Sequence, residues 1–114
     1  QLMVRAMISA AKADGQIDTR ESQMILQQVN DLPLDDEAKA FLFAEYSRPL
    51  DIEGLVAAVD SPEHAAEVYA ASALVVHPAS PAEQFYLDSL ARGLRLEAGL
   101  VQELHAAVES STTA

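Results

Sequence analysis

The residues best suited to chemistry lie in one acidic turn, Ala13-Asp14-Gly15-Gln16-Ile17-Asp18-Thr19-Arg20-Glu21. Its pattern Asp-Gly-x-Ile-Asp-x-x-Glu matches the second half of an EF-hand loop, with glycine at the sharp turn and glutamate at the end. The first half is missing, because the first and third loop positions fall on Ala10 and Lys12. The turn is therefore not an EF-hand. One interpretation remains a divalent-cation site for calcium or magnesium, formed by Asp14, Asp18 and Glu21 and completed by water or another loop.

The second interpretation of this turn is a helix cap that needs no ligand. Asp18 followed three residues later by Glu21 has the capping-box arrangement, in which each side chain accepts from the backbone N–H of the other residue. Both charges would also lie at the positive end of the helix dipole. Gly15 is suited to ending the preceding helix, since glycine adopts a positive φ at low cost.

A degenerate copy of this turn recurs 62 residues further along the chain. Asp18-Thr19-Arg20-Glu21 corresponds to Ser80-Pro81-Ala82-Glu83, and the apolar positions that follow also correspond. A single offset that preserves caps and helix phase predicts a duplicated three-helix unit. Asp14 corresponds to Val76, so the second copy keeps the cap and loses the acidic group. Because a cap does not require Asp14, this residue is the best sign of a role beyond capping.

Other reactive side chains do not form a catalytic set. The three histidines are widely spaced, at positions 64, 77 and 105, and no two have the helical spacing of metal ligands. Ser72 and Ser89 lack the glycines of a nucleophile elbow. Asp35-Asp36-Glu37 is most simply the charged first turn of a helix. We therefore expect no catalytic residues, and we expect that the chain is not an enzyme.

Composition and charge restrict the classes of partner. The 114 residues carry 18 acidic and 7 basic side chains, for a net charge of −11. Such a charge disfavours nucleic acid, which proteins bind by neutralising phosphates, and it favours cationic partners. Cysteine is absent, which excludes thiol catalysis and zinc–thiolate sites. The longest run without charged residues, from 68 to 82, contains two prolines and is shorter than the roughly 20 residues that cross a bilayer.

The elements that must position the acidic turn are all helices. Apolar residues recur at helical spacing between strong caps and proline-containing turns, and no segment alternates as a strand would. We expect an all-α, single-domain bundle of about seven helices over residues 1–109, followed by a polar tail over 110–114. The expected helices cover about 2–11, 19–30, 36–46, 52–59, 62–76, 81–94 and 97–108. The fifth is apolar on every side, which predicts that it lies at the centre or meets a partner on one face.

Two stretches carry a resemblance to a known family. Ala-Lys-Ala-Asp-Gly-Gln-Ile-Asp-Thr-Arg-Glu at 11–21 and Ser-Pro-Ala-Glu-Gln-Phe-Tyr-Leu-Asp-Ser-Leu-Ala at 80–91 resemble the TerB-like family of tellurite-resistance-related domains. Within that family they resemble the YebE-type bacterial inner-membrane proteins of unknown function. The resemblance covers nearly the whole chain. It implies an all-helical bundle with an acidic turn suspected of binding a divalent cation, and its acidic residues map onto Asp14, Asp18 and Glu21.

The same resemblance implies a location. In the YebE-type proteins this domain follows a membrane-associated N-terminal region, so we expect a bacterial protein tethered to the inner membrane through a segment that precedes these residues. Two functions follow as hypotheses. The first is a non-enzymatic interaction or scaffold module that binds a protein partner or forms a homo-oligomer. The second is a cation-binding, sensor-like domain that uses the acidic turn from Asp14 to Glu21.

Overall fold

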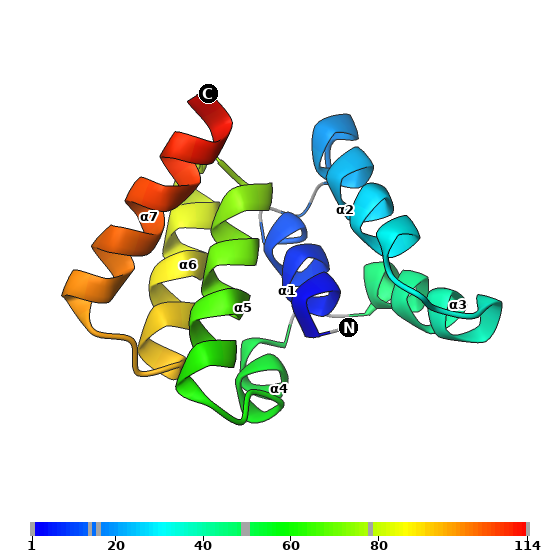
Figure 1. Ribbon diagram of the computed structural model, residues 1–114, viewed down its shortest axis with the longest axis horizontal. Coiled ribbons are helices and arrows are strands. Elements are labelled where there is room, and N and C mark those ends of the chain that lie inside the picture. Colours follow the sequence, from blue (N-terminus) through cyan, green and yellow to red (C-terminus); the bar gives the residue numbers. More distant parts are fainter. Residues whose placement is uncertain (1, 14, 16, 49–50, 78, 114) are drawn as a thin grey trace.

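The computed structural model describes residues 2–13, 15, 17–48, 51–77 and 79–113, and all the regular structure within them is helical (Figure 1). This confirms the all-α prediction, with seven α-helices and one short 3-10 helix in the described residues. The elements are α1 (Leu2–Ala11), α2 (Thr19–Asp31), α3 (Asp36–Ala44), η1 (Glu45–Ser47), α4 (Ile52–Ala57), α5 (Pro62–Val75), α6 (Pro81–Gly93) and α7 (Ala98–Thr113).

Side-chain caps begin five of these helices, and the predicted caps Asp18 and Ser80 are among them. Asp18, Asp35, Asp51, Ser61 and Ser80 each accept a hydrogen bond from the backbone N–H three residues later. Each bond satisfies a donor that the first helical turn would otherwise leave without a partner. The helix starts are therefore specified locally, by residue type and spacing.

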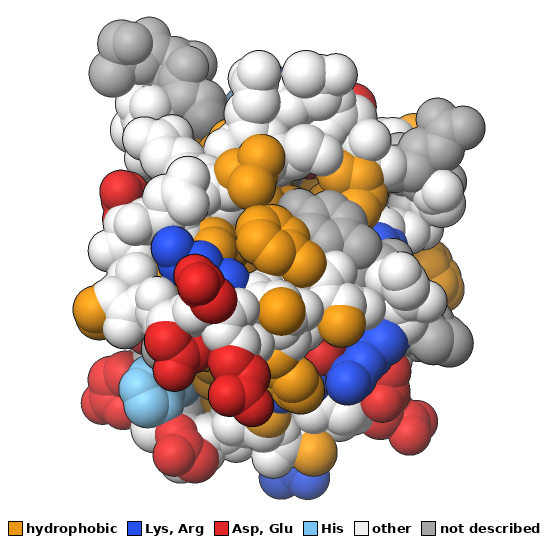
Figure 2. Space-filling view, turned by 90° about the vertical axis from the view of Figure 1, so that its right-hand side faces the viewer, with side chains coloured by type: hydrophobic (Ala, Val, Ile, Leu, Met, Phe, Trp, Pro, Cys, Tyr) orange, Lys and Arg blue, Asp and Glu red, His pale blue; other side chains and the backbone are white. Residues whose placement is uncertain are grey.

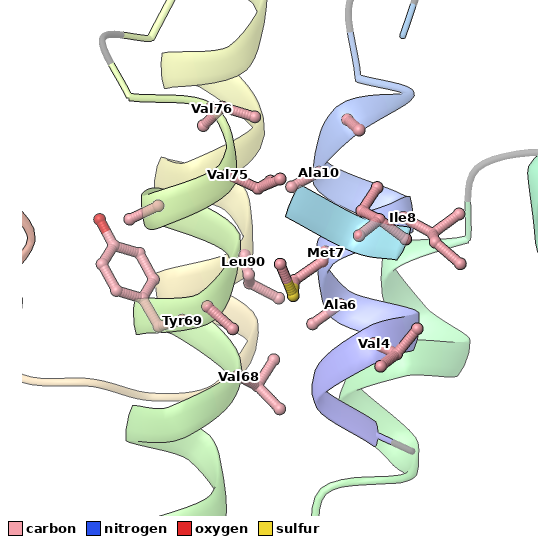
Figure 3. Close-up of a cluster of buried hydrophobic side chains, with 14 of the residues drawn as sticks. Val4, Ala6, Met7, Ile8, Ala10, Val68, Tyr69, Val75, Val76 and Leu90 are labelled. Atoms are coloured by element: carbon pink, nitrogen blue, oxygen red, sulfur yellow. The ribbon is translucent and has the colours of Figure 1, made fainter. Parts of the chain in front are cut away.

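The core forms around the close pair of α1 and α5. Figure 1 shows these helices side by side in the middle, with α6 and α7 beyond α5 and with α2 and α3 beyond α1. In Figure 3, Ala6, Met7 and Ala10 of α1 face Val68 and Val75 of α5. Small alanine side chains let the two backbones approach closely, and the contact removes apolar surface from water. The prediction that the fifth helix lies at the centre is thus correct.

Polar groups within this core are paired. The Ser72 hydroxyl donates to the carbonyl oxygens of Val68 at 2.9 Å and Ala6 at 3.3 Å, which links α5 to α1. The Tyr86 hydroxyl of α6 donates to Ser9 Oγ of α1 at 2.8 Å. Among the described residues, no buried side-chain nitrogen or oxygen lacks a hydrogen-bond partner. The core therefore holds no unsatisfied polar group that would point to a missing ligand there.

The last helix differs from its predicted length. The expected polar tail is helical as far as Thr113, since α7 runs from Ala98 to Thr113 without a break. No glycine or proline stops it after Val108, and the Ser111 hydroxyl donates to the Ala107 carbonyl oxygen at 3.0 Å. In the described part of the chain, no helix is long and apolar enough to span a membrane.

Candidate functional site

The acidic turn joins α1 to α2 at one end of the central helix pair. Gly15 has a φ of 86°, which glycine adopts without strain, and its N–H donates to the Lys12 carbonyl oxygen at 2.9 Å. The predicted cation site rests partly on Asp14, which lies outside the described residues. Its geometry is therefore described only for Asp18 and Glu21.

Asp18 and Glu21 form a complete capping box. The Glu21 N–H donates to Asp18 Oδ1 at 2.7 Å, and the Asp18 N–H donates to Glu21 Oε1 at 3.0 Å. Glu21 is only 4% exposed. Both carboxylates thus bond to the backbone of their own helix start. Within the described residues, no group of three or more acidic or histidine side chains could hold a metal ion.

The second copy of the turn forms an equivalent box. The Glu83 N–H donates to Ser80 Oγ at 3.2 Å, and the Ser80 N–H donates to Glu83 Oε1 at 2.9 Å. Glu83 is 5% exposed, so it is buried to the same degree as Glu21. The local structure of the two turns therefore agrees with the predicted repeat.

The two boxes meet through a buried pair of carboxyl groups. The side chains of Glu21 and Glu83 lie close enough to share a proton, which the protonated form of Glu21 can donate to Glu83. Burial and the negative charges of Asp18 and Glu83 outweigh the backbone hydrogen bond from Asp18 and raise the pKa of Glu21 to about 7. The pair therefore gives α2 and α6 a shared proton near neutral pH.

Arg20 gives α2 a second connection to the core. Its guanidinium donates to the carbonyl oxygens of Val75 at 2.9 Å and His77 at 2.8 Å, at the end of α5. These carbonyls have no partner within the helix, and a cation is favoured at a helix C-terminus. The acidic turn is thus fixed to the central helix by Arg20 and to α6 by Glu21. Sequence reasoning missed both contacts, and the repeat was the only signal that related residue 21 to residue 83.

The histidines lie apart, as their spacing predicts. His64 Nδ1 is 2.7 Å from Asp60 Oδ1 at the start of α5, and this hydrogen bond raises the pKa of His64. His105 Nε2 of α7 is 2.5 Å from the Tyr69 hydroxyl of α5. His77 follows the end of α5 and contributes its carbonyl oxygen to Arg20. Each contact stabilises a helix end or a helix pair.

An apolar groove crosses the outer face of α5. It consists of two hollows of about 260 and 270 Å³, which share Met3 of α1 and Glu67 of α5 in their linings. One hollow extends toward α2, where Gln28 and Leu32 line it. The other extends toward α7, with lining residues Ala70, Ala71, Leu74, Leu104, Ala107, Val108 and Ser111. Sequence reasoning allowed that one face of the fifth helix meets a partner, and this groove lies on that helix.

Comparison with known proteins identifies the family. The profile described as "Protein of unknown function (DUF533)" matches residues 1–108, which is nearly the whole chain. The chain belongs to the DUF533 family. This finding supports the expected relationship only at the level of an uncharacterised family.

A relative of this DUF533 chain is described as "Uncharacterized protein in ampR 5'region" from Yersinia enterocolitica. The two are 27% identical over 96 residues, which cover 84% of this chain and 69% of the relative. No solved structure matches the chain significantly. The family and the relative carry no assigned activity, so the function is argued from the surface of this DUF533 chain.

Proposed function

We propose that this chain is a non-enzymatic helical interaction module, and that the groove across α5 binds a cationic amphipathic helix of a protein partner. The observation that supports this proposal best is that α5 carries apolar residues on every side, and one of these sides remains uncovered. Ala70 and Leu74 on that side are only half-buried. An apolar strip between neighbouring helices is a surface on which an amphipathic helix lays its own apolar face.

The lining of the groove suits such an occupant. Alanines on α5 and α7 leave room for larger apolar side chains from outside. Met3 is 39% exposed in the middle of the groove, and its flexible thioether can adjust to different neighbours. Glu67 lies where the two hollows join, and a carboxylate there favours a lysine or arginine on the edge of the bound helix.

The net charge of the molecule also favours a cationic partner. With a net charge of −11, the chain attracts cationic segments over distances of about a Debye length and repels acidic ones. Two segments with the same apolar face and opposite charges should therefore bind very differently. This difference distinguishes a specific groove from general hydrophobic adhesion.

We also propose that the module is carried by a membrane-associated bacterial protein of TerB-like type. The support for this part is the resemblance of residues 11–21 and 80–91 to YebE-type inner-membrane proteins. Sedimentation of the full-length protein with inner-membrane vesicles after a salt wash would test it. Recovery only in the supernatant would refute the membrane association and leave the groove proposal intact.

The groove is tested with a synthetic amphipathic peptide of about 18 residues, with leucines on one face and lysines on the other. We expect a Kd on the order of 10 µM by fluorescence anisotropy, and much weaker binding of the same peptide with glutamate in place of lysine. The amide shifts on binding should map to α5 and α7.

Two neighbouring alanines of α7 provide a matched pair of variants. Both are exposed, but Ala107 lines the groove and Ala106 does not. Ala107→Arg places a long cation in the groove and should abolish peptide binding, while Ala106→Arg changes the net charge equally and should weaken binding only slightly. Equal loss in both variants would mean that charge alone attracts the peptide, and it would refute the groove as the site.

A further inference from the structure

The helix α3 leaves aromatic side chains on the surface. Leu42 is its only buried residue within the described part of the chain, whereas Phe41 is 55% exposed and Phe43 is also exposed. The main packing partner of α3 is η1, the short helix that follows it directly. Two exposed phenylalanines on one short helix are unusual for a surface that meets only water.

The internal repeat shows where the halves of the molecule differ. Leu42 of α3 corresponds to Leu104 of α7, and Phe41 corresponds to Glu103. The helix α7 packs along α5, whereas α1 packs against η1 and α4 rather than along α3. The helix α3 is therefore displaced from the central pair. At the outward position next to the shared leucine, α7 carries an exposed glutamate and α3 carries an exposed phenylalanine.

A hollow lies directly beside Phe41. It has a volume of about 520 Å³ and is lined by Arg5, Asp35, Glu37, Ala38, Phe41 and Leu42. Figure 2 views the molecule from the side of α2 and α3, and hydrophobic side chains gather in the middle of this face with acidic and basic groups around them. The hollow is large enough to receive an aromatic ring, and its lining contains both signs of charge.

Basic residues are concentrated around α3, although the molecule as a whole is strongly acidic. Four of the chain's seven basic residues lie in or beside α1, α3 and η1, together with four acidic residues in or beside α3 and η1. These eight residues are Arg5, Lys12, Lys39 and Arg48 with Asp35, Asp36, Glu37 and Glu45. We call this surface, together with Phe41, the α3 face.

Contacts within the α3 face hold its groups in place. Arg48 Nη1 is 3.3 Å from Glu45 Oε1, and the Arg48 guanidinium carbon is 5.3 Å from the centre of the Phe41 ring. Lys12 Nζ donates to the carbonyl oxygens of Glu45 at 2.5 Å and Arg48 at 2.8 Å, which fixes η1 to α1. A cation over an aromatic face favours one ring position, so Phe41 is positioned for contact before any partner arrives.

We propose that the α3 face binds a second copy of this chain in a two-fold dimer, in which Phe41 of each copy enters the hollow of the other. A two-fold interface must be self-complementary, and a hollow lined by both Arg5 and acidic residues meets that condition. Two molecules of charge −11 repel each other across most orientations. Because four of the seven basic residues lie on the α3 face, two copies that meet there repel each other less than over the rest of the surface and still bury aromatic surface.

The test compares two exposed phenylalanines by sedimentation velocity over a concentration series. Phe41→Asp removes the central aromatic ring, whereas Phe85→Asp changes a ring on α6 that is 70% exposed and lies outside the α3 face. We expect the native chain to dimerise at concentrations below about 1 mM. Phe41→Asp should raise the dimer Kd by roughly thirtyfold or more, because the substitution is present in both copies and removes two rings from the interface. Phe85→Asp should leave the dimer Kd unchanged.

Amide spectra of the native chain recorded over the same concentrations give an answer that does not depend on a variant. Shifts that change with concentration should map to residues 35–48 and leave α7 unaffected. A monomer at all concentrations, equal dimerisation of Phe41→Asp, or concentration-dependent shifts on α5 and α7 would each overturn the proposal. The groove proposal is judged separately by peptide binding, since it involves a different face.

Discussion

The buried pair of Glu21 and Glu83 makes the stability of the fold depend on pH in an unusual direction. The pKa of Glu21 is raised from its ordinary value of 4.5 to about 7. The folded chain therefore binds a proton that the unfolded chain releases between these two pH values. The stabilising contribution of protonated Glu21 to the unfolding free energy is fully present below about pH 4.5 and is lost as the pH rises through about 7. The contribution of Glu21 to the unfolding free energy changes by about 3 kcal/mol in all, because each unit of pKa difference corresponds to about 1.4 kcal/mol.

The substitution that isolates this effect is Glu21→Gln. The amide keeps the shape of the side chain, its oxygen can accept from the Asp18 N–H, and its nitrogen can donate to the Glu83 carboxylate. Because glutamine does not ionise, this contribution of Glu21 to the pH dependence disappears. We expect the variant to be more stable than the native chain at about pH 8, by up to about 3 kcal/mol, and to show little gain at about pH 4.5.

The assay is urea unfolding followed by far-ultraviolet circular dichroism across this pH range. The matched control is Glu103→Gln, which removes one carboxylate from an exposed position on α7. The quantity that decides is the difference in unfolding free energy between native chain and variant at each pH. A difference that is constant with pH for Glu21→Gln, or equal for the two variants, would refute the shared-proton interpretation.

Two further predictions concern the helix ends. Asp18→Ala should lower the unfolding free energy, measured by urea unfolding, by about 1 kcal/mol because α2 loses its cap. Calcium or magnesium up to about 1 mM should leave the amide chemical shifts of the turn unchanged. A saturable shift that disappears in Asp14→Asn would instead establish the cation site. Arg95 ends α6 with a φ of 59°, so Arg95→Gly should raise the unfolding free energy by up to about 1 kcal/mol. Arg92→Gly, within the last turn of α6, should lower it by a similar amount, and a loss in both variants would contradict the argument from φ.

The sequence predicts the helices of this fold well because their starts are encoded locally. Asp35 and Ser61 specify where α3 and α5 begin through side-chain bonds to residues three positions away. The same locality explains what the sequence could not predict. The contact of Glu21 with Glu83 depends on how α2 and α6 pack, and a capping box has the same pattern whether its glutamate faces water or another glutamate.

The candidate surfaces were harder to predict for a related reason. The apolar pattern of α5 does not show whether another helix of the chain or a separate partner covers a given face. Only the way that α2 and α7 pack against α5 leaves part of that face uncovered. Phe41 likewise belongs to an apolar stretch that predicts burial, yet it is exposed because η1 and α4 contact α1 in place of α3.

These differences between the halves point to where function has been added to a repeated fold. The capping boxes are shared by both units, and their glutamates bring the starts of α2 and α6 together. Where the units diverge, an exposed glutamate of α7 stands in place of Phe41 of α3. A glutamate at an exposed helical position costs nothing in water, whereas an exposed phenylalanine leaves apolar surface in contact with it. The asymmetry is best explained if that ring is buried when the protein is assembled, and α3 is therefore the element whose surface should be tested first.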